Sequence, residues 1–224
     1  MTDIQNSNLP RCLSLKKVAL SASKRSIETN ILYSDGKTGY LTDFWSKGYS
    51  QIQEQTYWCW VAVAAGIGSY YAQKPYYYRQ TPIYEKAKNI TPPGACVAPY
   101  RSFPNGSKCN ETGMPDKSLA SIGALAKKID GKADGPSILT ELLENRPLVI
   151  AVFFSHEIAS LGNAKGHAVV ISAAFNQNQL YPVWEVCNPW DNTRTLENFA
   201  TFPSYYYGDP GAYWRETYFT KKPI

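Results

Sequence analysis

The residues best suited to nucleophilic chemistry are the cysteines and histidines, of which the chain has five and two. Cys59 stands between two tryptophans in the stretch QEQTYWCW, residues 53–60. If Thr56 caps a helix, Cys59 lies in its first turn, where the partial positive charge of the helix favours a thiolate. Free backbone amides of that turn would also stabilise an oxyanion beside the sulfur. A cysteine between two tryptophans is also compatible with a plain core position.

A nucleophilic cysteine needs a base, and His156 and His167 are the two histidine candidates. His167 follows a glycine and opens the apolar run HAVVIS, which predicts a place at the start of a strand. His156 lies in the connection 155–166 and has no comparable setting. His167 is therefore the candidate base for Cys59, although a lone histidine at a strand start is also typical of a surface or core position.

The group that would orient the candidate base follows from a predicted hairpin. The polar residues 176–179 lie between two apolar runs, which predicts an antiparallel pair of strands joined there. Centred on that turn, the register sets His167 opposite Asn188, and directly opposed side chains touch. An amide at that point would hold one ring nitrogen and leave the other for Cys59. Asp191 is the alternative orienting group, and the Asn-Pro pair alone is also typical of an ordinary turn.

The elements that position these residues are read from periodicity and turn signals. A helix is expected over 57–72, with a face of small residues that suits close packing. Seven prolines in 74–116 exclude long regular elements from most of that stretch. Cys96 and Cys109 lie there, thirteen residues apart, and would form a disulfide in an oxidising compartment or remain two free thiols otherwise.

Two further helices and three strands are expected after residue 116. Ser118 is suited to cap a helix with Leu119, Ile122, Ala126 and Ile129 at helical spacing, and Pro136 suits the first position of the next helix. Strands are expected over 148–154, 168–175 and 180–187. Helices followed by strands predict an α+β fold. The polar residues 1–48, with short strand-like pieces at 31–33 and 40–45, are interpreted as an N-terminal arm or a pro-segment.

Composition excludes several classes of protein. The chain has 224 residues, 44% of them hydrophobic and 18% charged, which excludes disorder. Its net charge of +5 comes from scattered lysines and arginines, which argues against a nucleic-acid-binding protein. The longest apolar run, 148–154, is too short to span a membrane. The sequence contains no CxxC pair, which argues against a zinc site. No standard signal peptide is recognisable, so we expect a cytoplasmic protein or one secreted by a non-classical route.

Tyrosine is unusually frequent, with 17 copies that gather at 70–71, 76–78 and 205–207. Such residues commonly pack their rings inward and keep the hydroxyl near water. The alternative is a ligand groove lined by aromatic rings.

Several short motifs, in order, resemble the papain-like cysteine peptidases. Gln-x5-Cys-Trp at 53–60 is similar to the start of their active site, and QTYWCWVAVA resembles the bacterial branch of avirulence-effector and bacteriocin-processing peptidases. RPLV at 146–149, GHAVV at 166–170 and NPWD at 188–191 follow in the order of that branch. The resemblance spans about residues 50–192. It implies a papain-like catalytic domain over 49–224, with a helical part that carries the cysteine and an antiparallel sheet that carries the other residues.

The resemblance also implies a role for each site residue. Cys59 would be the nucleophile and His167 the general base, later acid, while Asn188 would orient the imidazole. Gln53 would help to stabilise the oxyanion, with Gln55 as the alternative for that role. Position 188 is Asn here, where many bacterial relatives carry Asp.

The expected function is hydrolysis of a peptide or protein amide bond through an acyl-enzyme, without a metal or organic cofactor. An effector or toxin role is one setting for such an enzyme, and an inhibitor or immunity protein would then be a partner. The same triad would also serve a deamidase, an isopeptidase or a transamidase. A third reading is a non-catalytic binding module on a papain-like scaffold. The sequence does not define the oligomeric state.

Overall fold

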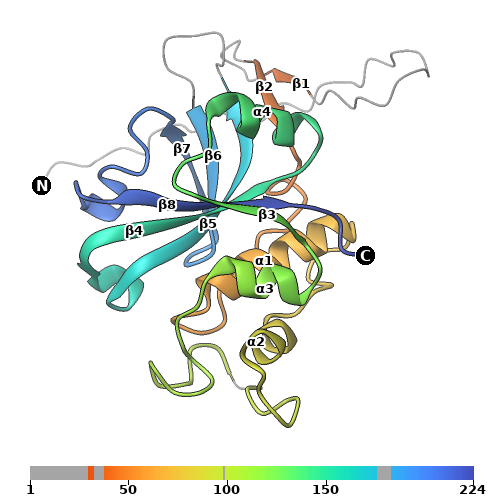
Figure 1. Ribbon diagram of the computed structural model, residues 1–224, viewed down its shortest axis with the longest axis vertical. Coiled ribbons are helices and arrows are strands. Elements are labelled where there is room, and N and C mark those ends of the chain that lie inside the picture. The colour runs from red at the N-terminus through yellow and green to blue at the C-terminus, as the bar shows by residue number, and fades with distance from the viewer. Residues whose placement is uncertain (1–29, 33–37, 98, 176–182) are drawn as a thin grey trace, which may run out of the picture.

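A computed structural model describes residues 30–32, 38–97, 99–175 and 183–224 of the chain (Figure 1). Within these ranges the helices are α1 (Cys59–Tyr71), α2 (Gln80–Lys88), α3 (Pro115–Ser121) and α4 (Gly135–Leu143), with short 3-10 turns η1 (Ala159–Leu161) and η2 (Tyr206–Gly208). The strands are β1 (Asn30–Leu32), β2 (Thr38–Leu41), β3 (Leu125–Asp130), β4 (Leu148–Ile158), β5 (Ala164–Phe175), β6 (Val183–Asn188), β7 (Thr193–Asn198) and β8 (Tyr213–Thr220). No helix in these ranges is long and apolar enough to cross a membrane.

All strand pairs of the sheet are antiparallel. The strand order is β1-β2-β5-β4-β8-β3. Strand β6 pairs with β5 along the edge opposite β4, and β7 pairs in turn with β6. The long hairpin β4–β5 forms the centre, where Val152 pairs with His167. Four helices with an antiparallel sheet confirm the mixed helix-and-sheet class that the sequence predicts.

Helix α1 is buried on every side. From Trp60 to Tyr70 each of its residues is buried, because the helix lies between the sheet and the pair α2 and α3 (Figure 1). Its small residues permit close contacts: a Cβ at Gly66 would lie 3.0 Å from both the Phe44 ring and the Tyr49 carbonyl oxygen. The predicted helix over 57–72 is confirmed to within two residues at its start.

The sheet has a hydrophobic core on each face. One core joins α1 to Val149, Ala151, Ala168 and Val170, and the other joins α4 to Ile150, Val152, Val169 and Ile171. The alternation of these residues follows from the pleat of β4 and β5, which sends successive side chains to opposite faces. The apolar runs 148–154 and 168–175 are therefore buried on both faces, as predicted.

The predicted helix over 119–129 is wrong. Helix α3 begins earlier, at Pro115, and ends before Gly123, whose φ of +73° is the left-handed conformation that terminates a helix. Residues 125–130 then form β3, an edge strand with mostly exposed side chains. Ser118 lies inside α3, where its hydroxyl donates to the carbonyl oxygens of Trp60 and Pro115.

The other helix expectations have mixed outcomes. Pro136 is the second residue of α4, one position later than predicted, and Asp134 caps that helix by accepting the Ser137 amide at 2.7 Å. Helix α2 was not expected, because Pro82 lies within it. A proline is tolerated there because the amides of the first turn have no partner within the helix.

The polar N-terminal stretch joins the sheet before residue 49. Strand β2 pairs with β5 at residues 173–175, and the Thr42 amide donates to the Ser172 carbonyl oxygen at 3.0 Å. Phe44 is buried in the core beside α1. The interpretation of residues 1–29 and 33–37 as an arm or pro-segment falls outside the described residues, and so does Cys12.

Candidate active site

Cys59 is the first residue of α1. The preceding Trp58 makes no side-chain cap, and its carbonyl oxygen accepts the amides of Val61 and Ala62. The expected cap from Thr56 is therefore wrong, although Cys59 does occupy the first turn. Cys59 as a whole residue is partly exposed, whereas its thiol is enclosed and is not part of a disulfide.

His167 and Asn188 are in direct contact. His167 Nε2 lies 2.7 Å from Asn188 Oδ1, and both residues are buried. The predicted contact is confirmed, but the predicted register is wrong, because Val170 pairs with Cys187. Asn188 therefore stands level with Val169, two residues beyond His167 on the same face of β5. Such diagonal neighbours are within reach of long side chains.

The orientation of the Asn188 amide is fixed by two further contacts. Its Oδ1 accepts the Trp190 amide at 3.0 Å, and its Nδ2 donates to the Tyr207 hydroxyl at 2.6 Å. Oδ1 can only accept, so His167 Nε2 must carry the proton. His167 Nδ1 is then left with a free lone pair, which is the state a general base requires.

Asp191, the alternative orienting group, is held elsewhere. Its Oδ1 accepts the amide and the hydroxyl of Thr193, at 3.2 and 2.6 Å. Its negative charge still acts on His167 from a distance, since it raises the pKa of the imidazole. The structure thus gives the orienting contact to Asn188.

Cys59 and His167 open onto one pocket of about 310 Å³. Most of its wall is apolar, and among the described residues that line it Lys165 alone carries a permanent charge. The apolar wall includes Trp60, Met114, Phe153, Leu161, Ala168 and Trp190. Sequence reasoning missed most of this lining, because it comes from loops and strand ends that meet only in the fold.

Burial sets the charge of both reactive groups. It raises the pKa of Cys59 to about 11, and the nearby amides of Ala168, Trp60 and Cys59 itself offset only part of this rise. Burial lowers the pKa of His167 to about 4, against the hydrogen bond that His167 donates to Asn188 and the charge of Asp191, which both raise it. Desolvation thus outweighs the helix terminus that was expected to favour a thiolate. Between about pH 4 and about pH 11 both groups are therefore uncharged at rest, with one proton on the Cys59 sulfur and one on His167 Nε2.

The low pKa of His167 makes the fold sensitive to acid. A histidine in the unfolded chain has a pKa near 6.5, whereas His167 in the folded chain binds a proton only near pH 4. Protonation of the unfolded chain therefore lowers the free energy of unfolding as the pH falls from about 6.5 to about 4, and this loss is absent above about pH 6.5. We expect the free energy of unfolding in urea to fall over this window, and less steeply in His167→Gln. Parallel slopes for the two proteins would contradict this expectation.

Gln53 and Gln55 both brace the loop before Cys59. Gln53 is fully buried, and its Nε2 donates to the carbonyl oxygens of Gln55 and Thr56 at 2.9 and 2.6 Å. Its Oε1 is buried without a hydrogen-bond partner in the described part of the chain. Gln55 donates to the Pro99 carbonyl oxygen and accepts the Phe103 amide. The structure does not bring either glutamine into the pocket lining.

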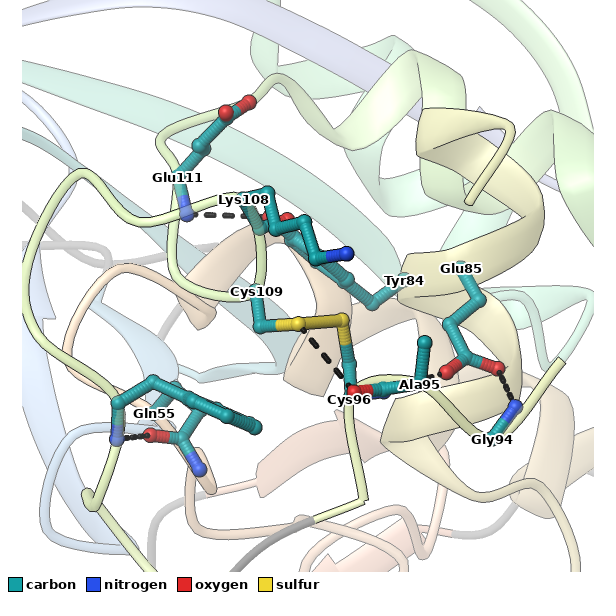
Figure 2. The surroundings of a disulfide bond; sticks show 10 residues. Gln55, Tyr84, Glu85, Gly94, Ala95, Cys96, Lys108, Cys109 and Glu111 are labelled. Carbon is teal, nitrogen blue, oxygen red and sulfur yellow. Dashed lines mark hydrogen bonds between the residues drawn. A yellow bond between two sulfur atoms is a disulfide. The ribbon is translucent and has the colours of Figure 1, made fainter. Parts of the chain in front are cut away.

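A disulfide between Cys96 and Cys109 closes the loop that supports this site (Figure 2). Helix α2 holds the loop through Glu85, whose carboxylate accepts the amides of Gly94 and Cys96, both at 2.8 Å. Tyr84, also on α2, donates its hydroxyl proton to the Lys108 carbonyl oxygen at 2.9 Å. The sequence alone left open whether these two cysteines pair.

The loop contacts both sides of the site. Asn110 Oδ1 accepts the amide of Tyr57, two residues before Cys59, at 2.9 Å. On the other side, Arg101 donates to the Trp190 carbonyl oxygen at 2.8 Å, and its guanidinium lies 3.9 Å from the centre of the Trp190 ring. The disulfide loop, together with Asn110 directly after it, therefore links the segment that carries the thiol to the segment that follows Asn188.

The sequence matches no protein-family model and no curated protein sequence. The described residues also contain no group of three or more His, Cys, Asp or Glu side chains arranged to hold a metal ion.

Proposed function

We propose that this chain is a papain-like cysteine peptidase that hydrolyses a peptide or protein amide with Cys59, His167 and Asn188. The observation that carries the proposal is the 2.7 Å contact between His167 Nε2 and Asn188 Oδ1, beside a pocket that also contains the Cys59 thiol. A base with a fixed tautomer and a cysteine at a helix start are the parts that thiol acyl transfer needs.

We infer that a proton transfer accompanies the attack of the thiol on the substrate. At rest the thiol is protonated and the imidazole neutral, so His167 Nδ1 accepts the thiol proton as Sγ bonds to the substrate carbonyl carbon. The amides of Cys59 and Trp60, which already interact with Sγ, are placed to stabilise the oxyanion. His167 then protonates the leaving amine as the carbon–nitrogen bond breaks. Water, deprotonated by the same nitrogen, hydrolyses the thioester and restores the thiol.

The pocket supports a substrate class as well. Its wall of Trp60, Met114, Phe153 and Leu161 favours an apolar side chain close to the cleaved bond. The Cys96–Cys109 disulfide supports an enzyme that works outside a reducing cytoplasm, as an exported effector or toxin would. A protein inhibitor that fills the pocket is the partner such an enzyme would need in the cell that makes it.

A peptide mixture tests the proposal. We expect the protein to produce new amino termini in a proteome-derived peptide mixture, detected by mass spectrometry, and to do so preferentially beside apolar residues. Cys59→Ala is the control and should produce none. Release of ammonia without new termini would replace the peptidase with a deamidase, and newly joined peptides would indicate a transamidase. If wild type and Cys59→Ala give the same products, the catalytic proposal fails and a binding module remains.

A further inference from the structure

The aromatic segment at η2 takes no part in the proposed reaction, yet one of its residues contacts both Asn188 and His167. The Tyr207 hydroxyl accepts the hydrogen bond from Asn188 Nδ2 at 2.6 Å. Its ring stands edge-on to the His167 ring, with centroids 6.1 Å apart and planes at 86°. We propose that Tyr207 is a positioning residue of the active site, which holds Asn188, and through it His167, in the reactive orientation. This inference rests on the proposed function.

The backbone of this segment is held in an unusual conformation. Tyr205 and Tyr207 both have left-handed φ angles, +65° and +53°, which an aromatic residue adopts rarely and at an energetic cost. The segment keeps this shape because the Tyr205 amide donates to the Asp209 carbonyl oxygen at 2.9 Å. The Asp209 carboxylate in turn accepts the amide and hydroxyl of Ser155, at 2.6 and 2.7 Å. Backbone held in this way directs the Tyr207 hydroxyl at Asn188.

The hydrogen-bond inventory of Asn188 explains why the hydroxyl matters. The Trp190 amide can only donate, so it decides which end of the Asn188 amide faces His167. In this orientation Asn188 Nδ2 needs an acceptor of its own, because Asn188 is buried away from water, and the Tyr207 hydroxyl is that acceptor. Without the tyrosine oxygen, the side chain would rotate toward water to satisfy that donor. His167 Nε2 would then lose its acceptor, and the ring would lose both its fixed tautomer and its fixed direction.

Tyr207→Phe isolates the hydroxyl, because the ring stays to pack against Phe154 and Tyr206. We expect kcat to fall by about tenfold to about a hundredfold with KM unchanged, the range that a small misplacement of a catalytic group produces. Tyr205→Phe is the matched control in the same segment, since Tyr205 is 72% exposed, and this variant should behave as wild type. In an Asn188→Ala background, Tyr207→Phe should have no further effect on kcat.

A second readout does not need turnover. Nitrogen NMR of the His167 ring in the resting protein should show the Nε2-protonated tautomer in wild type and a mixture of tautomers in Tyr207→Phe. If Tyr207→Phe lowers the unfolding temperature but leaves kcat and the tautomer as in wild type, the residue is merely structural and the inference falls. A full further loss in the Asn188→Ala background would also overturn it. Failure of the proposed function would appear separately, as activity that survives Cys59→Ala.

Discussion

Replacing His167 with glutamine should lower kcat by about 10⁶-fold while the protein stays folded. The magnitude is that found when the histidine base of a catalytic triad is removed and the rest of the site remains. The side-chain amide of glutamine can still donate to Asn188 Oδ1, so the buried acceptor keeps a partner. What the variant lacks is a nitrogen that takes the thiol proton and returns it to the leaving amine. Steady-state kinetics on the best peptide found in the mixture would measure this loss.

The chain offers a matched control in its second histidine. His156 lies in β4, the strand that pairs with the His167 strand, but its side chain is 62% exposed. It is not among the residues that line the pocket. His156→Gln should therefore keep the wild-type kcat. Equal activity losses in the two variants, or none in His167→Gln, would remove the imidazole from the mechanism.

The second large effect should come from opening the disulfide loop. The double change Cys96→Ser and Cys109→Ser should lower the free energy of unfolding by about 3 kcal/mol, the value for a closed loop of this length. For a chain of this size the melting temperature would fall by roughly 6–12 °C. The constraint on the unfolded chain is lost, and so is the fixed spacing between Arg101 inside the loop and Asn110 directly after it.

Calorimetry of the oxidised protein and of the double variant would measure this change. A Cys12→Ser background removes the remaining cysteine of the N-terminal stretch, so that thiol exchange does not complicate the comparison. A reducing agent should lower the melting temperature of the parent and leave that of the double variant unchanged. An unchanged melting temperature in the double variant would mean that the hydrogen bond donated by Tyr84 and those accepted by Glu85 suffice to hold the loop.

The parts of the fold with strong local signals were predictable. The continuous apolar runs of β4 and β5 and the small-residue periodicity of α1 reflect burial, which a sequence records directly. The helix over 119–129 was wrong because its apolar residues matched helical spacing, while Gly123 ended the helix and the following residues joined the edge of the sheet. Strands β7 and β8 went unpredicted, since β7 is largely exposed and gives no apolar pattern.

The residues of the candidate site likewise fall into those that the sequence predicts and those that it does not. Cys59 and His167 were found from residue type and neighbours, and Asn188 from a hairpin whose register was then wrong. The contact survives that error because the structure replaces a direct pair with a diagonal one on the same face. Tyr207 and the loop contacts of Arg101 and Asn110 had no sequence signal, because each depends on backbone placed by distant parts of the chain.

The burial of the Cys59 thiol has a consequence for how long the protein would last before it meets a substrate. Peroxides and disulfide reagents attack the thiolate, and a thiol whose pKa is about 11 exists almost wholly in its protonated form near neutral pH. The resting sulfur is therefore a slow target for oxidation in surroundings that keep Cys96 and Cys109 joined. The same desolvation that raises the pKa of the Cys59 thiol therefore also protects the sulfur chemically.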